Sequence, residues 1–178
     1  MKHISTFFIT AVLFSGVMIL TRCSDKETTF PIALNNVNAC INAGVKDTAA
    51  WKTIRKADIE SFFSQNGISF NFSNLKEVRL NTATVTLETP SGGNFSDIIV
   101  FDMYFRQFGT TGLGTKVAYL TAIADSSANV TLSSNYSELE SFFALDSFQA
   151  GLHINRNPAI ETKCVNGSIS LNVKVKGE

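Results

Sequence analysis

Proline, cysteine, histidine and net charge are all scarce in this chain, and each scarcity excludes something. The 178 residues include three Pro, three Cys and two His, and the fifteen Lys and Arg balance the fifteen Asp and Glu. A chain without an excess of Lys and Arg has no basic stripe for nucleic acid. With so few His and Cys, a zinc site built from them is disfavoured. Low Pro content with many Phe, Thr, Ser and Asn argues against disorder and favours β structure.

The longest uncharged stretch lies near the N-terminus. Residues 1–3 carry positive charge, and the seventeen residues 4–20 that follow contain no charged residue. A basic start followed by an uncharged apolar run is typical of a secretory signal peptide. An uncleaved N-terminal anchor is the alternative, because the run is close to the lower limit of about 17 residues for a membrane-spanning helix.

The uncharged run ends in the sequence LTRC at residues 20–23. This sequence resembles a bacterial lipobox, in which a signal peptidase cuts before a cysteine that carries acyl chains. Arg22 departs from that pattern, since the residue before the cysteine is usually Gly, Ala or Ser. No small-x-small cleavage motif competes nearby. The resemblance therefore implies a signal peptide at residues 1–22 and lipid on Cys23.

A short polar segment follows Cys23 and begins with Ser-Asp-Lys-Glu. This start resembles that of small surface lipoproteins of Bacteroidota, in which such residues direct transport to the outer face of the outer membrane. The resemblance covers residues 1–27. It implies a polar tether at residues 23–29, a membrane anchor through the N-terminal lipid, and an outer-membrane lipoprotein exposed at the cell surface.

Residues 30–178 are expected to form a single domain. Removal of the signal peptide leaves 156 residues, enough to bury roughly 70% of the surface of the unfolded chain. Lys2 and Arg22 leave with the signal peptide, so thirteen Lys and Arg remain against fifteen Asp and Glu. One hydrophobic core and a nearly neutral surface are the consequence.

Two cysteines remain once Cys23 is assigned to lipid, namely Cys40 and Cys164. An even pair in an exported protein, without CxxC or metal-ligand spacing, predicts a disulfide. Such a bond would tie the first and last strands of the domain together and stabilise it by roughly 5 kcal/mol at most in the chain-entropy model. Two free buried thiols are the alternative.

Alternating apolar and polar residues predict many short strands. The clearest example is residues 168–175, with one buried and one wet face. Residues 98–105 are apolar on both faces, which predicts a central strand, and a change of phase between Thr82 and Ala83 predicts a β-bulge. The predicted fold class is all-β: an antiparallel β-sandwich of roughly eight strands with one or two short helical plugs. The expected strands lie at residues 30–41, 68–72, 75–90, 98–105, 116–123, 129–133, 148–154 and 168–175.

The hexapeptide DIESFF at residues 58–63 returns as ELESFF at residues 138–143. In each copy three apolar residues stand at i, i+3 and i+4, so they share one face of a short helix. Asp58 is the predicted cap and Gly67 the predicted stop of the first helix, and Ser137 to Glu140 reads as a capping box for the second. Since each copy precedes an alternating segment, both are interpreted as helical plugs of the sandwich. A ligand site built from paired Phe residues is the alternative.

No catalytic set stands out among the polar residues. His153 is the only histidine after the signal peptide, so a zinc site or a Ser-His-Asp triad would depend on it alone. Asp97 and Asp102 are separated by an odd number of residues, so they point to opposite faces of a regular strand and cannot flank one glycosidic bond. Asp102 has only apolar neighbours in sequence, which favours a hydrogen-bonded structural carboxylate over a catalytic one. No metal or cofactor is predicted.

These observations favour a non-enzymatic surface lipoprotein that binds a glycan or a protein, or that is an accessory subunit of an outer-membrane complex. A carrier whose cavity holds a lipid or other apolar ligand is the alternative, and a hydrolase is disfavoured. The candidate ligand-contact aromatics are Trp51, Tyr104 and Tyr136. The sequence Asp-Thr-Ala resembles the O-glycosylation signal of Bacteroidota and makes Thr48 a candidate acceptor.

Overall fold

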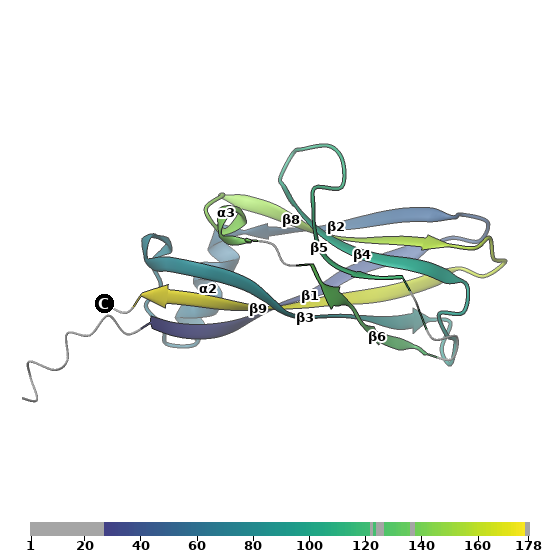
Figure 1. Ribbon diagram of the computed structural model, residues 1–178, viewed down its shortest axis with the longest axis horizontal. Coiled ribbons are helices and arrows are strands. Elements are labelled where there is room, and N and C mark those ends of the chain that lie inside the picture. The colour runs from purple at the N-terminus through teal and green to yellow at the C-terminus, as the bar shows by residue number, and fades with distance from the viewer. Residues whose placement is uncertain (1–26, 122, 124–126, 136–137, 177–178) are drawn as a thin grey trace, which may run out of the picture.

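The chain folds into two antiparallel β-sheets that pack face to face (Figure 1). The computed structural model describes residues 27–121, 123, 127–135 and 138–176. The order of strands is β1-β9-β3-β6 in the four-stranded sheet and β2-β8-β4-β5-β7 in the five-stranded sheet. The predicted antiparallel β-sandwich is therefore confirmed. The strands are β1 (Glu27–Ile41), β2 (Asp47–Arg55), β3 (Leu75–Thr89), β4 (Ile98–Gln107), β5 (Thr115–Leu120), β6 (Asn129–Thr131), β7 (Ser133–Ser134), β8 (Ser147–Arg156) and β9 (Lys163–Lys176).

The core lies between the two sheets and follows the alternation in the sequence. Along β9 every second residue is buried, and the residues between them are half-buried, as expected for a strand with one face toward a core. β4 is the central strand of its sheet, as predicted. Its Phe101, Met103 and Phe105 are fully buried against the other sheet. Its intervening residues point to the outer face of the sandwich.

β1 and β9 pair along nearly their whole length, and the predicted disulfide joins them. Cys40 lies directly opposite Cys164 in the ladder, and the two sulfur atoms are bonded across a sequence separation of 124 residues. The Cα atoms are 4.0 Å apart. The bond links the first strand of the domain to the last on the outer face of the four-stranded sheet, and the prediction is confirmed.

The long strand β3 carries the irregularity that the change of phase predicts. Its pairing with β9 shifts register between Leu80 and Thr82, within two residues of the predicted position. The extra residue lets Val78 and Ala83, which have opposite parity, both turn toward the core, where both are fully buried. A β-bulge restores the buried face of a strand whose sequence alternation breaks.

Two sequence-based expectations are wrong in detail, and one strand has no counterpart among the predicted ones. Residues 68–72 do not form a strand, because Phe70 and Phe72 pack in an aromatic cluster with Phe63 without entering a ladder. β2 was not predicted, because Lys52 interrupts its apolar face and donates a hydrogen bond to Asn35 of β1. The residues assigned to the end of the polar tether begin β1, where Glu27 pairs with Lys176.

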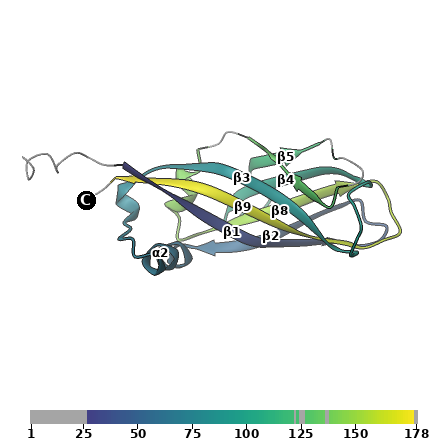
Figure 2. The same cartoon turned by 90° about the horizontal axis from the view of Figure 1, so that it is seen from below.

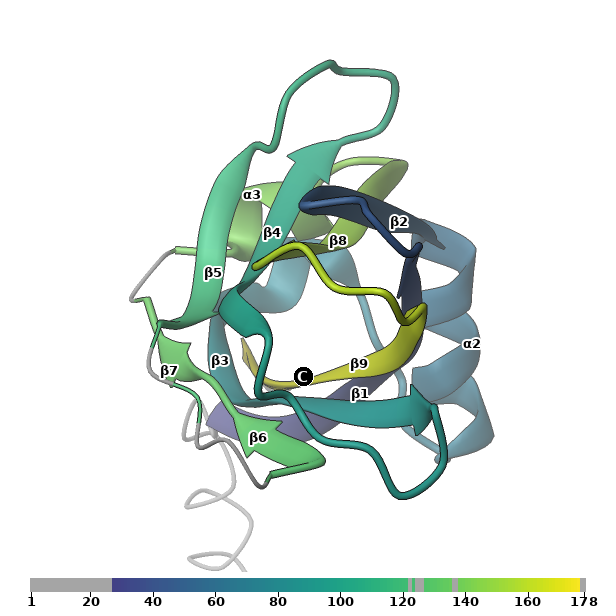
Figure 3. The same cartoon turned by 90° about the vertical axis from the view of Figure 1, so that its right-hand side faces the viewer.

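The two ESFF copies form helices near the same end of the sandwich (Figures 1 and 2). α2 (Lys56–Gln65) buries Ile59 and Phe63, and Gly67 follows it at φ 69°, as the predicted stop requires. The view along the long axis shows α2 beside the strand edges of β1 and β2 (Figure 3). α3 (Glu140–Phe143) is a single turn that buries Phe143. A short 3₁₀ turn, η1 (Phe72–Asn74), precedes β3.

The predicted caps of these helices differ from the observed ones. Arg55 occupies the N-cap of α2, and its amide donates to the carboxylate of Asp58, which therefore stands three residues inside the helix. Glu140 accepts a 2.8 Å hydrogen bond from the amide of Val78 in β3, so its carboxylate holds α3 against the four-stranded sheet. Ser137, the other half of the predicted capping box, lies outside the described residues.

Candidate functional site

The outer face of the five-stranded sheet concentrates aromatic and charged side chains. The register between neighbouring strands places them there, and an irregularity in the β4–β5 ladder brings both Lys116 and Tyr119 to this face although their positions differ in parity. We call this surface the aromatic face. Its members are Trp51 on β2, Asp102, Tyr104 and Arg106 on β4, Lys116 and Tyr119 on β5, and His153 on β8.

Trp51 lies flat across the sheet because its neighbour is a glycine. Trp51 pairs with Gly151 in the β2–β8 ladder, and a Cβ atom on Gly151 would come within 2.3 Å of the indole ring. The guanidinium carbon of Arg106 lies 3.5 Å from the centroid of a Trp51 ring, which is a cation–π contact. The backbone of Gly151 therefore covers one face of the indole and Arg106 the other, so the ring is a support within the surface.

Arg106 also fixes the loop between β4 and β5. Its Nε donates to Oε1 of Gln149 at 2.8 Å, and one terminal nitrogen donates to the carbonyl of Gly112 at 2.6 Å. The loop, residues 108–114, projects from the five-stranded sheet in two perpendicular views (Figures 1 and 3). Phe108 of this loop is 55% exposed. One arginine thus joins Trp51 and an exposed aromatic loop into a single surface.

Asp102 is the centre of a polar cluster on the same face. It is only 5% exposed. Its Oδ2 lies 2.9 Å from the Nζ of Lys116 and accepts a 3.1 Å hydrogen bond from the hydroxyl of Tyr104. His153 stands beside it, with Nδ1 3.7 Å from that same Oδ2 and Nε2 2.6 Å from Oδ1 of Asp47. Asp102 is thus the hydrogen-bonded carboxylate that the sequence favours.

The electrostatics of this cluster hold Tyr104 and Lys116 in their protonated forms. Burial raises the pKa of Tyr104, and the negative charge of Asp102 raises it further. The hydrogen bond to Asp102 raises the pKa of Lys116. A phenol and an ammonium with raised pKa values are poor nucleophiles and bases at neutral pH. Within the described residues, the hydrogen-bond partners of Asp102 and His153 include no serine, so these contacts do not form a Ser-His-Asp triad.

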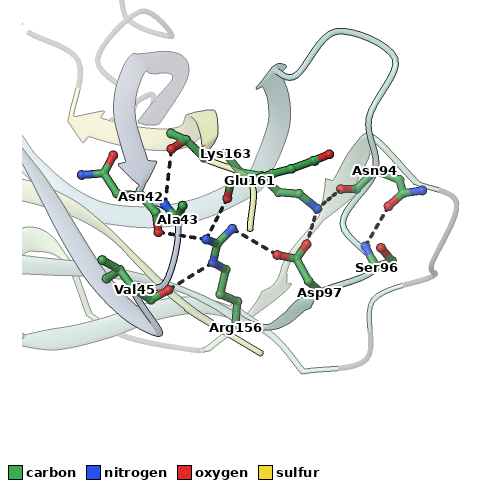
Figure 4. A network of polar contacts seen from close by, with 10 residues as sticks. Asn42, Ala43, Val45, Asn94, Ser96, Asp97, Arg156, Glu161 and Lys163 are labelled. Atoms are coloured by element: carbon green, nitrogen blue, oxygen red, sulfur yellow. Dashed lines mark hydrogen bonds and ion pairs between the residues drawn. The ribbon is translucent and has the colours of Figure 1, made fainter. Parts of the chain in front are cut away.

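A second polar cluster closes the end of the sandwich opposite the two helices (Figure 4). Arg156 is fully buried and donates to the carbonyls of Val45, Asn42 and Glu161. It also pairs with Asp97 at 3.1 Å. These bonds tie the loops that follow β1 and β8 to the turn before β4.

Lys163 completes the end cluster from the first position of β9. Its ammonium group pairs with Asp97 and donates to the carbonyl of Asn94. The charge of Asp97 is therefore matched by two buried cations, Arg156 and Lys163. Asp97 and Asp102 belong to separate clusters, and this separation agrees with the expectation that they cannot act as a catalytic pair.

Several predicted site residues are largely buried, lie apart from these clusters or lie outside the described residues. Thr48 is half-buried in β2 opposite Ile154, and Tyr104 is buried under its neighbours. Cys23 and Tyr136 lie outside the described residues. In the part of the chain that is described, no three His, Cys, Asp or Glu side chains gather as metal ligands, and no helix is long and apolar enough to cross a membrane.

An open cleft at the edge of the sandwich is the feature nearest to a carrier site. It has a volume of about 400 Å³ and lies between the edges of β1 and β2, beside α2. Ile32, Leu34 and Ile59 line it, but they are already packed into the core and almost fully buried. The cleft is therefore a shallow groove above packed side chains.

Comparisons with known proteins yield only distant likenesses in structure. No family model matches the chain, and no curated protein matches it. The BFDV capsid protein in its decameric form has a TM-score of 0.42 at 12% identity, over 85% of this chain and 100% of that one. The Turnip yellow mosaic virus structure has a TM-score of 0.32 at 17% identity, over 87% and 96% of the two chains. At these TM-scores the likenesses support no inference about function.

Proposed function

We propose that this protein is an exported lipoprotein, anchored at the outer membrane through Cys23, that binds a partner through the aromatic face and does not catalyse a reaction. The observation that carries the binding role is the Arg106 contact set. One side chain stacks on Trp51 and holds the loop that exposes Phe108. Tyr and Arg are among the residues most enriched at binding hot spots, and here Tyr119 and Arg106 lie on rigid strands, with Trp51 packed beneath Arg106.

The length of the tether supports a definite orientation. Three residues, Ser24 to Lys26, separate Cys23 from the start of β1 at Glu27. Four residue steps span at most about 14 Å. A lipid on Cys23 would therefore hold the Glu27 end of the sandwich close to the membrane, with the Arg156 end away from it. The aromatic face would then lie along the side of the molecule, where a neighbouring surface protein or glycan can reach it.

The chemistry of the Asp102 cluster supports binding over turnover. Its tyrosine and lysine have raised pKa values, and these two residues already engage one oxygen of its carboxylate. An active site requires a base or nucleophile whose pKa suits its task at the working pH. The cluster instead supplies fixed charges and hydrogen-bonding groups on a rigid sheet, which suits recognition.

Anchoring is tested by metabolic labelling of cells with an alkyne fatty acid. We expect label on the wild-type protein and none on a Cys23→Ala variant. Equal labelling of both proteins would contradict the lipid anchor.

The binding role is tested by crosslinking in whole cells and quantitative mass spectrometry of the co-purified proteins and glycans. We expect Phe108→Ser to reduce recovery of the partner, because it removes an exposed ring beside Arg106. The matched control is Ile160→Ser, which removes a side chain that is 95% exposed near the Arg156 end. Equal recovery with both variants would contradict the assignment of the aromatic face.

A further inference from the structure

We propose that the Asp102 cluster binds the hydroxyl groups of a carbohydrate, with the ring of Tyr119 against the sugar. The inference deepens the proposed function and rests on it, because it names the class of partner that one part of the aromatic face receives. The geometry of Asp102, His153 and Tyr119 carries the argument.

Asp102 offers an acceptor that the protein itself does not use. Its Oδ2 is engaged with Lys116 and Tyr104, but its Oδ1 is buried and has no hydrogen-bond partner among the described residues. A buried acceptor without a donor costs stability. Because this oxygen has almost no accessible surface in the structure, a ligand that brings a hydrogen-bond donor reaches it only when the surrounding side chains move apart, and such a ligand would then satisfy it.

His153 offers a second acceptor beside the first. Its Nε2 lies 2.6 Å from the carboxylate of Asp47, which can only accept a hydrogen bond when ionised. In the neutral ring the hydrogen therefore resides on Nε2, and Nδ1 keeps a free lone pair. This Nδ1 is buried without a hydrogen-bond partner in the described part of the chain, since Asp102 at 3.7 Å is too distant for a hydrogen bond.

The surrounding charges select the class of ligand. A metal cation would meet the ammonium group of Lys116, which lies 2.9 Å from Oδ2 of Asp102. An anion would meet two carboxylates, those of Asp47 and Asp102. A neutral ligand with adjacent hydroxyl groups avoids both repulsions and supplies two donors to the two neighbouring acceptors. Carbohydrates are the ligands that carry hydroxyl groups in such pairs.

The register of the sheet places an aromatic ring next to these acceptors. Asp102 pairs with Tyr119 of β5 on one side and with His153 of β8 on the other. The three residues therefore form a row across the outer face, with neighbouring Cβ atoms about 5 Å apart. Tyr119 is 39% exposed. An exposed ring packs well against the apolar C–H surface of a sugar, so the row combines an apolar contact with hydrogen-bond acceptors.

The test is a titration of the isotopically labelled full chain with five carbohydrates, followed by amide chemical shifts. The probes are the methyl glycosides of glucose, galactose and mannose, together with N-acetylglucosamine and maltose. We expect at least one probe to shift the amides around Asp102, Tyr119 and His153. Asp102→Asn should weaken that binding by roughly tenfold or more, because it replaces a charged acceptor with an amide.

Two further variants keep the result interpretable if Asp102→Asn fails to fold. Tyr119→Ala changes an exposed side chain and should weaken binding several-fold, and Thr82→Ala on the opposite face should leave it unchanged. The inference is overturned if no probe binds, or if binding is equal in wild type, Asp102→Asn and Tyr119→Ala. Loss of a protein partner in Phe108→Ser cells without any carbohydrate binding would overturn this inference and leave the proposed function standing.

Discussion

The two outer faces of this sandwich share the same strand geometry but carry different chemistry. On the four-stranded sheet the outward positions in the middle of β9 hold Asn166, Ser168, Ser170 and Asn172, and Lys174 and Lys176 follow them at its end. On the five-stranded sheet the corresponding positions hold the indole, phenol, guanidinium and imidazole groups of the aromatic face. Short polar side chains are sufficient to keep a sheet solvated. The second face therefore contains more than solvation requires, and this difference is the basis for placing binding there.

The largest loss of stability should follow from substitutions in the core, which supports both faces equally. Phe63→Ala and Phe143→Ala should each destabilise the protein by about 3–5 kcal/mol, because both rings are fully buried. Chemical denaturation measures the loss. Phe62→Ala is the matched control and should cost less, since Phe62 is half-buried. An equal loss for Phe62 and Phe63 would show that the helix face is assigned incorrectly.

The second-largest loss of stability is expected from removal of the disulfide, which lies on the outer face of the four-stranded sheet. Replacement of Cys40 and Cys164 by Ser should lower the free energy of unfolding by about 2–5 kcal/mol, because the unfolded chain loses a long closed loop. Partner binding should persist at temperatures where the variant remains folded. Loss of binding by the folded variant would mean that the two faces are not independent.

A single added methyl group should disturb the aromatic face more than the outer face of the four-stranded sheet. Gly151→Ala places a Cβ atom where the Trp51 ring lies, so we expect a loss of about 1–3 kcal/mol from overpacking. Trp51 is the only tryptophan in the chain, so its fluorescence should report the displacement directly. Unchanged emission and unchanged stability would contradict the position of the indole over Gly151.

The smallest losses of stability are expected for substitutions of two arginines on opposite faces of the sandwich. Arg106→Met should cost about 1–2 kcal/mol, because Arg106 stacks on the indole, and it should alter Trp51 emission. Arg79 on β3 pairs with Glu77, but its side chain is 57% exposed, so Arg79→Met should change stability by no more than about 0.5 kcal/mol. Thermal melting followed by Trp fluorescence distinguishes the two outcomes.

Much of the fold can be predicted because alternation of apolar and polar residues indicates a strand with one buried face. β9 and β8 show it in their sequences, and the central position of β4 follows from its two apolar faces. β2 was missed because Lys52 points along the apolar side and reaches the carbonyl of Asn35 at the open edge. The prediction of a strand at residues 68–72 is wrong because an alternating segment can pack its rings on a helix without joining a ladder.

The candidate site was harder to predict because it depends on register between strands. Trp51 and Tyr104 stand out in the sequence as aromatic residues, but Arg106 and Gly151 do not. The sequence does contain one signal, since Asp102, Tyr104 and Arg106 alternate with buried residues along β4 and therefore share its outer face. The contacts of Arg106 with Trp51 and Gly112 involve segments far apart in the sequence, which only the tertiary structure brings together.

The most direct test of the account is photo-crosslinking in cells with a photoreactive amino acid at single positions on each face. We predict that Leu113 and Tyr119, on the aromatic face and its loop, will give discrete crosslinked partners. Thr82 and Thr86, exposed on the four-stranded sheet, should give none. Crosslinks from the threonine positions, with none from Leu113 or Tyr119, would contradict the assignment of binding to the aromatic face.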